Sequence, residues 1–358
     1  MTTSLQQNFL SLIKLGIGIP VPNFPSGLDW SAIETIASQQ GLLPIVVDGI
    51  EELPDAKRPP KDLLLQWIGD ILQNELQNAI QKNAAVAMAE LFHDNYIRSY
   101  VLKGEVIAEC YPKPNHRTSV DLDCYLMPFN CGFDAWSLGN DLIKGKGFQV
   151  NTDFYKNSTF YLPGLTVENH QFLTPFRGNK KLAALESVLQ SLLHRDKGEN
   201  KFDGTWLYRP PVMVSALFLI EHAYSHFLHE GLTWRFVLDW MMFINKHQNE
   251  IPWMEFDAYI DEFGFRKFYD SYMRLGQYLL GNRSEDELSN VDRLMLADIW
   301  APLDLHETVR GFKGKIALAG NTWRARWKYR HFTDITWQRA LWIQAKGVLF
   351  IKEPQLDN

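Results

Sequence analysis

The sequence predicts an α+β fold in which a small mixed sheet core is flanked by an N-terminal and a C-terminal helical region. Three observations support this prediction. Apolar side chains recur at the three- and four-residue spacings of helices over residues 1–98. Short apolar or alternating runs, which are typical of strands, replace them over 99–176, and helical spacing returns over 177–358. The middle segment is therefore the predicted α/β core, and the two outer segments are helical.

The composition is that of an ordinary folded protein of 358 residues, with 46% hydrophobic and 22% charged side chains, so a disordered or collagen-like chain is excluded. The formal net charge of −6 argues against nucleic-acid binding over the whole surface. The cysteines Cys110, Cys124 and Cys131 form no CxxC pair, which argues against a disulfide framework and favours a reducing compartment. The first residues lack the charged and apolar pattern of a signal peptide, so none is expected, and no apolar run reaches about 18 residues. We therefore expect a cytoplasmic protein without a membrane span.

Spacing and breaker residues divide each region into elements. The helices predicted in the first region are 4–15, 29–40, 61–71 and 73–97, separated by the proline-containing segments 21–27 and 54–60. The core is predicted to contain strands at 99–104, 120–127, 147–150, 158–162 and 166–173, a short helical segment at 105–111 and a helix at 134–146. The helices predicted in the last region are 181–194, 211–229, 232–247, 253–263, 265–280, 284–299 and 322–350.

The core contains two carboxylates two residues apart, Asp121 and Asp123, in a predicted strand. Residues two apart on a strand point to the same face, so these carboxylates lie side by side while Leu122 points into the core. Like charges at this distance repel each other unless a cation lies between them. Carboxylate oxygens at this spacing suit Mg²⁺, which often binds two carboxylates together with substrate phosphates.

Two cationic residues and a glycine precede these carboxylates. The predicted strand that ends at Lys103 and Gly104 leads into a helical segment, whose backbone N–H groups can bind phosphate oxygens. Lys103 and Arg117 can neutralise the same phosphates, and arginine does so with bidentate geometry. An isolated Asp-x-Asp is more often a solvated strand face than a metal site. Its combination with the Lys-Gly pair and the arginine is what favours phosphate chemistry.

Residues 102–126 resemble the uncharacterised nucleotidyltransferase family of the polymerase-β-like nucleotidyltransferase superfamily in the run LKGEVIAECYPKPNHRTSVDLDCYL. Members show a Lys-Gly pair, a Tyr-Pro pair, an arginine and then Asp-x-Asp, in this order. The third carboxylate comes from a later strand and is followed two residues on by histidine, and Glu168 and His170 match this pattern. His222 and the segment 232–240 resemble the family's helical-domain signature.

This resemblance extends over roughly residues 40 to 245 and implies an enzyme that moves a nucleoside monophosphate from an NTP to an acceptor, releasing pyrophosphate, with Mg²⁺ (or Mn²⁺) as cofactor. It implies two-metal catalysis in which Glu168 also helps to deprotonate the acceptor hydroxyl. The implied metal-binding and catalytic residues are Asp121, Asp123 and Glu168. The implied nucleotide-binding residues are Lys103, Gly104, Arg117 and Ser119. The implied substrate-facing residues are His170, His222, Arg235 and Asp239.

Several alternatives stay open at this point. Lys103-Gly104 stands where the superfamily often has Gly-Ser, and Asp153 is an alternative to Glu168 as the third acid. A nucleotide-sugar glycosyltransferase also uses Asp-x-Asp, but it would need a Rossmann-like unit where residues 1–98 are predicted to be helical. A catalytically inactive nucleotide-binding module is the non-enzymatic alternative. The sequence does not specify the acceptor, whether small molecule, sugar, protein or RNA, or the oligomeric state.

The helical half contains two further polar features. The histidines His222, His226 and His229 share one helix face, and a structural or substrate-facing role is favoured over zinc binding. Residues 310–352 contain ten Lys/Arg and a single acid, Asp334, interleaved with tryptophans. Such a surface can bind RNA or another acidic partner, but a basic helix docked on the acidic body is favoured. Because the core alone is too small to enclose an NTP and an acceptor, we expect flanking helices to complete the cleft.

Overall fold

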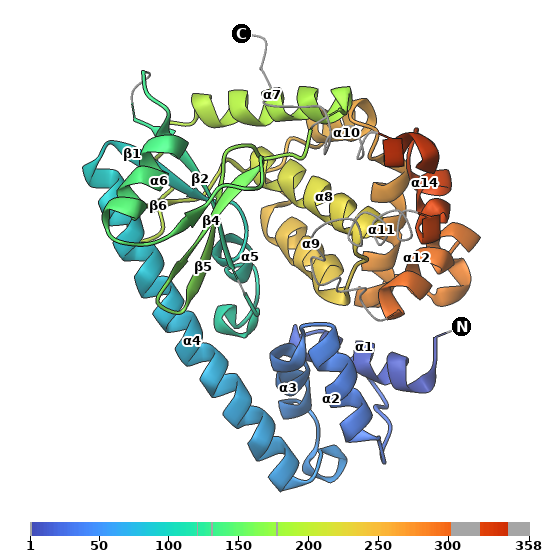
Figure 1. Cartoon of the computed structure of the whole chain (residues 1–358). Coiled ribbons are helices and arrows are strands. Elements are labelled where there is room, and N and C mark those ends of the chain that lie inside the picture. The colour runs from blue at the N-terminus through green and yellow to red at the C-terminus, as the bar shows by residue number, and fades with distance from the viewer. Residues whose placement is uncertain (1, 120, 130–131, 177, 302–322, 343–358) are drawn as a thin grey trace.

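The computed structural model describes residues 2–119, 121–129, 132–176, 178–301 and 323–342 of the chain. Its centre is a six-stranded mixed sheet with the strand order β3-β4-β5-β2-β1-β6 (Figure 1). The strands are β1 (Ile97–Val101), β2 (Asp121–Pro128), β3 (Val150–Asn151), β4 (Asn157–Leu162), β5 (Leu165–His170) and β6 (Leu207–Tyr208). Helices surround this sheet, so the α+β fold predicted from the sequence is confirmed.

Strand β2 presents different side chains to the two faces of the sheet. It pairs antiparallel with β1 and parallel with β5. Leu126 points to the face covered by α4 (Lys61–Asp94) and α6 (Ala135–Gly145), where a Cβ added to Gly139 would lie 2.3 Å from Leu126 Cδ1. Because side chains alternate along a strand, Asp123 points to the opposite face, toward helices from the second half of the chain.

The N-terminal region contains one helix that the sequence did not predict. Its elements are α1 (Ser4–Gly16), α2 (Trp30–Gln39), α3 (Leu43–Glu51) and a 3₁₀ turn at Asp55–Lys57, followed by α4. In α3, Pro44 and Gly49 would ordinarily be taken as helix breakers. The proline lies in the first turn, where a helix does not need its N–H, and the glycine packs against α1.

Helix α4 is a single helix of 34 residues, so the prediction of two separate helices at 61–71 and 73–97 is wrong. Figure 1 shows it running from the N-terminal helices to the sheet. It buries side chains at its two ends but none between Ile71 and Ala85. The apolar periodicity is therefore interrupted in the middle, although the helix continues.

The second half of the chain is mostly helical, as predicted. Its helices are α7 (Lys180–Arg195), α8 (Val212–His229), α9 (Trp234–His247), α10 (Trp253–Glu262), α11 (Arg266–Leu280), α12 (Asn290–Trp300) and α14 (Arg326–Phe332). The helix predicted at 284–299 begins later, because Ser289 caps its N-terminus. Strand β6 pairs in parallel with β1, which the sequence did not predict. Short helical segments in the core are α5 (Glu105–Ala108) and a 3₁₀ turn at Pro114–His116.

The described part of the basic C-terminal stretch docks on the helical body. In α14, Lys328 Nζ lies 2.8 Å from Asp298 Oδ2 and donates to the carbonyl of Phe227 at 2.7 Å. The Trp327 ring packs edge-on against Phe227. This arrangement agrees with a basic helix docked on an acidic body. The rest of 310–352 lies outside the described residues. None of the helices in the described part of the chain is long and apolar enough to span a bilayer.

A prediction about helix packing concerns Gly49 on α3, where an added Cβ would lie 2.1 Å from the carbonyl oxygen of Leu12 on α1. Overpacking of this kind costs about 1–3 kcal/mol. We expect Gly49→Ala to lower the free energy of unfolding, measured by urea denaturation, by that amount. Gly69→Ala on α4 is the matched control, because a Cβ there meets nothing within 4 Å and alanine is the better helix former. Equal stability of the two variants would contradict this packing.

Candidate active site

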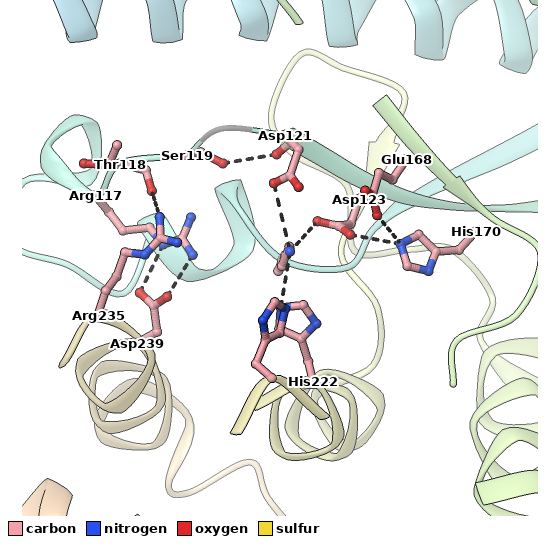
Figure 2. A network of polar contacts seen from close by, with 12 residues as sticks. Arg117, Thr118, Ser119, Asp121, Asp123, Glu168, His170, His222, Arg235 and Asp239 are labelled. Atoms are coloured by element: carbon pink, nitrogen blue, oxygen red, sulfur yellow. Dashed lines mark hydrogen bonds and ion pairs between the residues drawn. The ribbon is translucent and has the colours of Figure 1, made fainter. Parts of the chain in front are cut away.

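The three acidic side chains singled out in the sequence lie on one patch of the sheet. Strand β2 carries Asp121 and Asp123 on the same face, and β5 places Glu168 directly opposite Asp123. Figure 2 shows these carboxylates directed into a common space. Ligand atoms of Asp123, Glu168 and His170 all lie within 4.8 Å of one another. Asp153 is exposed between β3 and β4, and it is not part of this cluster of described residues.

The ammonium of Lys103 lies between the two aspartates. Its Nζ lies 2.9 Å from Asp123 Oδ2 and 4.0 Å from Asp121 Oδ1. Burial opposes the charge on Lys103, but the two aspartates outweigh it and raise the pKa of this lysine. Lys103, for which the sequence suggests phosphate binding, is held in this structure as the counter-ion of the aspartates.

His222 on α8 approaches the same ammonium from the helical side. Its Nε2 lies 3.3 Å from Lys103 Nζ. Burial, and then the charge of Lys103, hold the pKa of His222 well below its ordinary value. The neutral imidazole therefore accepts a hydrogen bond from the ammonium. This contact joins the helical half of the chain to the carboxylates.

His170 holds two of the carboxylates from the other side. Its Nε2 lies 2.9 Å from Asp123 Oδ1 and 3.7 Å from Glu168 Oε2. Burial lowers the pKa of His170, so a neutral ring donates its Nε2–H to Asp123. Burial alone would raise the pKa of Asp123, but Lys103 and this hydrogen bond hold that pKa well below its ordinary value. Asp123 is therefore a fixed negative charge in the interior.

Glu168 is the carboxylate whose negative charge is destabilised by its position among the others. Burial, followed by the charges of Asp123 and Asp121, raises the pKa of Glu168 to about 7. A further cation beside these carboxylates would relieve that repulsion.

Oxygen donors of this kind are the ligands that Mg²⁺ and Mn²⁺ prefer, and an ammonium already stands among them as a cation. The residues therefore fit a divalent metal, with Asp121, Asp123 and Glu168 as the side chains that would hold it.

A buried guanidinium lies at the other end of the site. Arg117 donates to both carboxylate oxygens of Asp239 on α9, at 3.1 and 2.8 Å. The hydroxyl of Tyr111 donates to the same carboxylate at 2.7 Å. The Tyr-Pro and Arg motifs of the core are therefore connected to the helical-domain aspartate, which fixes α9 against the core.

Arg235 brings a second guanidinium to this end of the site. Its NH1 donates to the carbonyl of Thr118 at 2.9 Å, and no described carboxylate forms an ion pair with it. Among the described residues Asp239 is ion-paired with Arg117 and no acid is ion-paired with Arg235, so the two guanidiniums outnumber the carboxylate that is paired with them (Figure 2). Such an excess favours an anionic ligand.

Gly104 and Ser119 lie side by side beneath the carboxylates. Gly104 has a positive φ of 68° and precedes α5, and a Cβ there would lie 3.3 Å from Ser119 Oγ. The Ser119 hydroxyl donates to the carbonyl of Asp121 at 3.2 Å. Glycine is required at this position by the backbone conformation and by the close approach of the serine.

These side chains line a cleft of about 250 Å³ between the sheet and helices α8 and α9. Its polar lining residues are Lys103, Arg117, Ser119, Asp121, Glu168, His222, His226, Arg235 and Asp239. Gly104, Asp123 and His170 lie behind this lining, in contact with it. The expectation that flanking helices complete the cleft agrees with this arrangement. His229 is turned away and bonds to the carbonyl of Ser225, so the histidine row does not converge on one point.

The N-terminal helices support the cleft through contacts that the sequence did not predict. Asp48 on α3 accepts from Lys113 at 2.6 Å and lies 2.8 Å from Nδ1 of His116, just ahead of Arg117. The Gln40 amide accepts from the Trp234 backbone N–H at the start of α9. The contacts of Asp48 follow from α3, which the sequence did not identify, whereas Gln40 lies at the C-terminal end of α2, which it did. The one sequence signal for these contacts was Asp48 itself, an acidic residue within an otherwise apolar segment.

The match to a known family is consistent with this geometry. The profile of the family described as uncharacterised nucleotidyltransferase matches residues 26–281, which include every site residue from Lys103 to Asp239. The chain therefore belongs to this family, and the resemblance seen in the sequence is confirmed. Membership supports a nucleotidyltransferase activity and an NTP substrate. No curated protein and no solved structure matches the chain.

The raised pKa of Glu168 predicts a pH-dependent cost to stability. The folded chain holds this proton up to a pKa of about 7, whereas the ordinary value is 4.5. Stability is therefore lost as the pH rises between these values, because the folded state binds more protons than the unfolded state. We expect Glu168→Gln, in metal-free buffer, to raise the free energy of unfolding by about 1 kcal/mol at about pH 8 and by less at about pH 5.5, allowing for the partial exposure of the carboxyl.

The measurement is urea denaturation at the two pH values. Glu90→Gln, at an exposed position on α4, is the matched control and should change little at either pH. A Glu168→Gln variant that is less stable than the parent chain at the higher pH would contradict the crowding of these carboxylates.

Proposed function

We propose that the protein transfers a nucleoside monophosphate from an NTP to an acceptor hydroxyl and releases pyrophosphate, with Mg²⁺ or Mn²⁺ as cofactor. One observation carries the proposal: three carboxylates lie on one patch of the sheet, two of them paired with a single ammonium, beside a cleft whose other end holds two guanidiniums and one carboxylate. This charge distribution suits a metal-bound triphosphate. The metal end would lie at the carboxylates and the remaining phosphates at the guanidiniums.

The carboxylates Asp121, Asp123 and Glu168 would hold the metal ions in this scheme. When bound, two such ions stabilise the charge on the attacking and leaving oxygens of an in-line displacement. His170 keeps Asp123 oriented and ionised by donating its Nε2–H. Glu168 Oε accepts the proton of the acceptor hydroxyl, and its position opposite Asp123 supports this role.

The cationic side chains bind the phosphates. Arg235 is the guanidinium with no carboxylate partner among the described residues, so it is the one free to take a phosphate oxygen. Arg117 is occupied by Asp239 and acts by adding charge and by fixing α9. Lys103 would contact a phosphate oxygen in place of Asp121 and Asp123 when another cation neutralises these aspartates. Gly104 and Ser119 set the backbone conformation at the start of α5 and ahead of β2.

The geometry of the site bears differently on the two alternatives, a glycosyltransferase and a nucleotide-binding module without catalysis. A glycosyltransferase of the Asp-x-Asp type is disfavoured, because the described residues before β1 form helices and no Rossmann-like unit. A nucleotide-binding module without catalysis has one observation in its favour, the lysine lodged among the carboxylates. We further propose a cytoplasmic location, which the free, buried thiols of Cys110 and Cys124 support.

The double variant Asp121→Asn, Asp123→Asn tests the metal site. We expect it to lose Mg²⁺-dependent release of pyrophosphate from NTPs while it remains folded, because the oxygens that neutralise the metal are gone. Asp153→Asn, in the exposed segment before β4, is the matched control and should keep its activity. Unchanged turnover in the double variant would rule out the proposed reaction. Calorimetry with ATP separates the non-catalytic alternative, for which affinity would not depend on Mg²⁺.

Arg235→Ala tests the phosphate end. Removing a charged hydrogen bond to a phosphate should raise KM for the NTP by about tenfold or more, since such bonds contribute about 1.5–3 kcal/mol. The melting temperature should change little, because within the described part of the chain the side chain makes a single hydrogen bond, to a carbonyl. Arg293→Ala, at an exposed position on α12, is the control. A lower melting temperature with unchanged kinetics would assign Arg235 to the scaffold.

A further inference from the structure

Lys156 lies at the edge of the site, next to His170 on the neighbouring strand, and no pattern in the sequence singles it out. It immediately precedes β4, whose first residue, Asn157, pairs with His170 across the sheet. Its backbone carbonyl accepts the N–H groups of Gln171 and Phe172, at 2.8 and 3.0 Å. Two hydrogen bonds and a strand register therefore fix this residue next to His170.

The ammonium of Lys156 reaches the junction between the sheet and α8. Its Nζ lies 5.9 Å from the ring centroid of Phe218. The same ring is 6.2 Å from that of His170 and 5.8 Å from that of His222. The side chain is half-buried, and within the described part of the chain its Nζ makes no ion pair and no hydrogen bond. This half-buried cation thus lies among site residues and has no direct counter-ion among the residues that the structure describes.

Two acids of the site keep raised pKa values despite the charge of Lys156. Burial raises the pKa of Glu168 and of Glu221, and the positive charge of Lys156 opposes this rise only in part. Glu221 on α8 is fully buried, and its carboxylate oxygens have no hydrogen-bond partner among the described residues. Burial raises the pKa of Glu221 to about 7, so it is only partly ionised at neutral pH.

The positions of the two arginines and of β4 indicate which substrate Lys156 can contact. In Figure 2 the guanidiniums of Arg117 and Arg235 lie on the side of Asp121 away from Glu168 and His170, where the triphosphate is proposed to bind. Strand β4 lies on the side of β5 away from β2. There Thr159 stands directly across from Glu168, and Tyr161 is 67% exposed on the same face. The surface beside Glu168 and away from the triphosphate is therefore formed by β4 and Lys156.

We propose that Lys156 binds an anionic group, a phosphate or a carboxylate, of the acceptor, and so places the acceptor hydroxyl along β4 at Glu168. This inference rests on the proposed nucleotidyl transfer and names its acceptor class. The acceptor oxygen forms a bond to the α-phosphorus while the bond from that phosphorus to the bridging oxygen breaks. Pyrophosphate leaves, and the hydroxyl proton passes to Glu168. The ammonium of Lys156 takes no part in these bond changes and acts by positioning.

The test uses the full chain and a hydrolysis-resistant NTP analogue with Mg²⁺. A first calorimetric titration measures binding of the analogue, and its failure would overturn the proposed function itself. With the analogue saturating, so that the triphosphate end is filled, a second titration adds inorganic phosphate, and a third adds acetate. We expect at least one of these anions to bind, and the stronger of the two identifies the anionic group.

Variants assign that second site. Lys156→Met should weaken anion binding by about tenfold, or ~1.4 kcal/mol, whereas Lys156→Arg should retain it and analogue binding should not change. Lys146→Met, at an exposed position after α6, is the matched control. Analogue binding without any second anion site, or a second site that survives in Lys156→Met, would overturn the inference and leave the proposed function standing. A comparison of kcat/KM for acceptors that differ only in carrying a phosphate then extends the test from binding to turnover.

Discussion

The structure depends on keeping three carboxylates together on one patch of a sheet. Asp121, Asp123 and Glu168 are brought together by strand alternation and by the register between β2 and β5, and their repulsion must be offset. Lys103 and His170 supply that offset, because one places an ammonium between the aspartates and the other donates a hydrogen bond to Asp123. The repulsion is not fully neutralised at Glu168, because its pKa stays raised. The repulsion that remains favours the binding of a further cation.

The rest of the fold positions groups around that patch. Helix α8 brings His222 to the ammonium, and α9 brings Asp239 to Arg117. The N-terminal helices hold the loop before β2 through Asp48 and hold the start of α9 through Gln40. The cleft is thus built by all three regions of the chain, and the charge in it changes from negative at the sheet to positive beside α9.

The spacing of apolar residues was sufficient to predict β2, β4, β5 and most helices, because a buried face sets their periodicity. The sequence also predicted that Asp121, Asp123 and Glu168 belong to one site, since alternation on a strand and the family motifs do not depend on tertiary contacts. The break predicted inside α4 came from a stretch that buries nothing. Lys156 and Asp48 could not be found, because their roles arise from the register of β4 and the packing of α3. The pairing of Arg117 with Asp239 joins positions far apart in the chain, which no local pattern shows.

We propose that the position now held by the Lys103 ammonium is the cation site of the protein. Titration of Mn²⁺ in the absence of nucleotide, on the parent chain and on Lys103→Met, tests it most directly. We expect the variant to bind Mn²⁺ more tightly, because a positive charge that competes for Asp121 and Asp123 has been removed. Lys146→Met should bind Mn²⁺ like the parent chain. An unchanged or lower affinity in Lys103→Met would rule out this cation site, since the lysine and the metal would then not compete for the same oxygens.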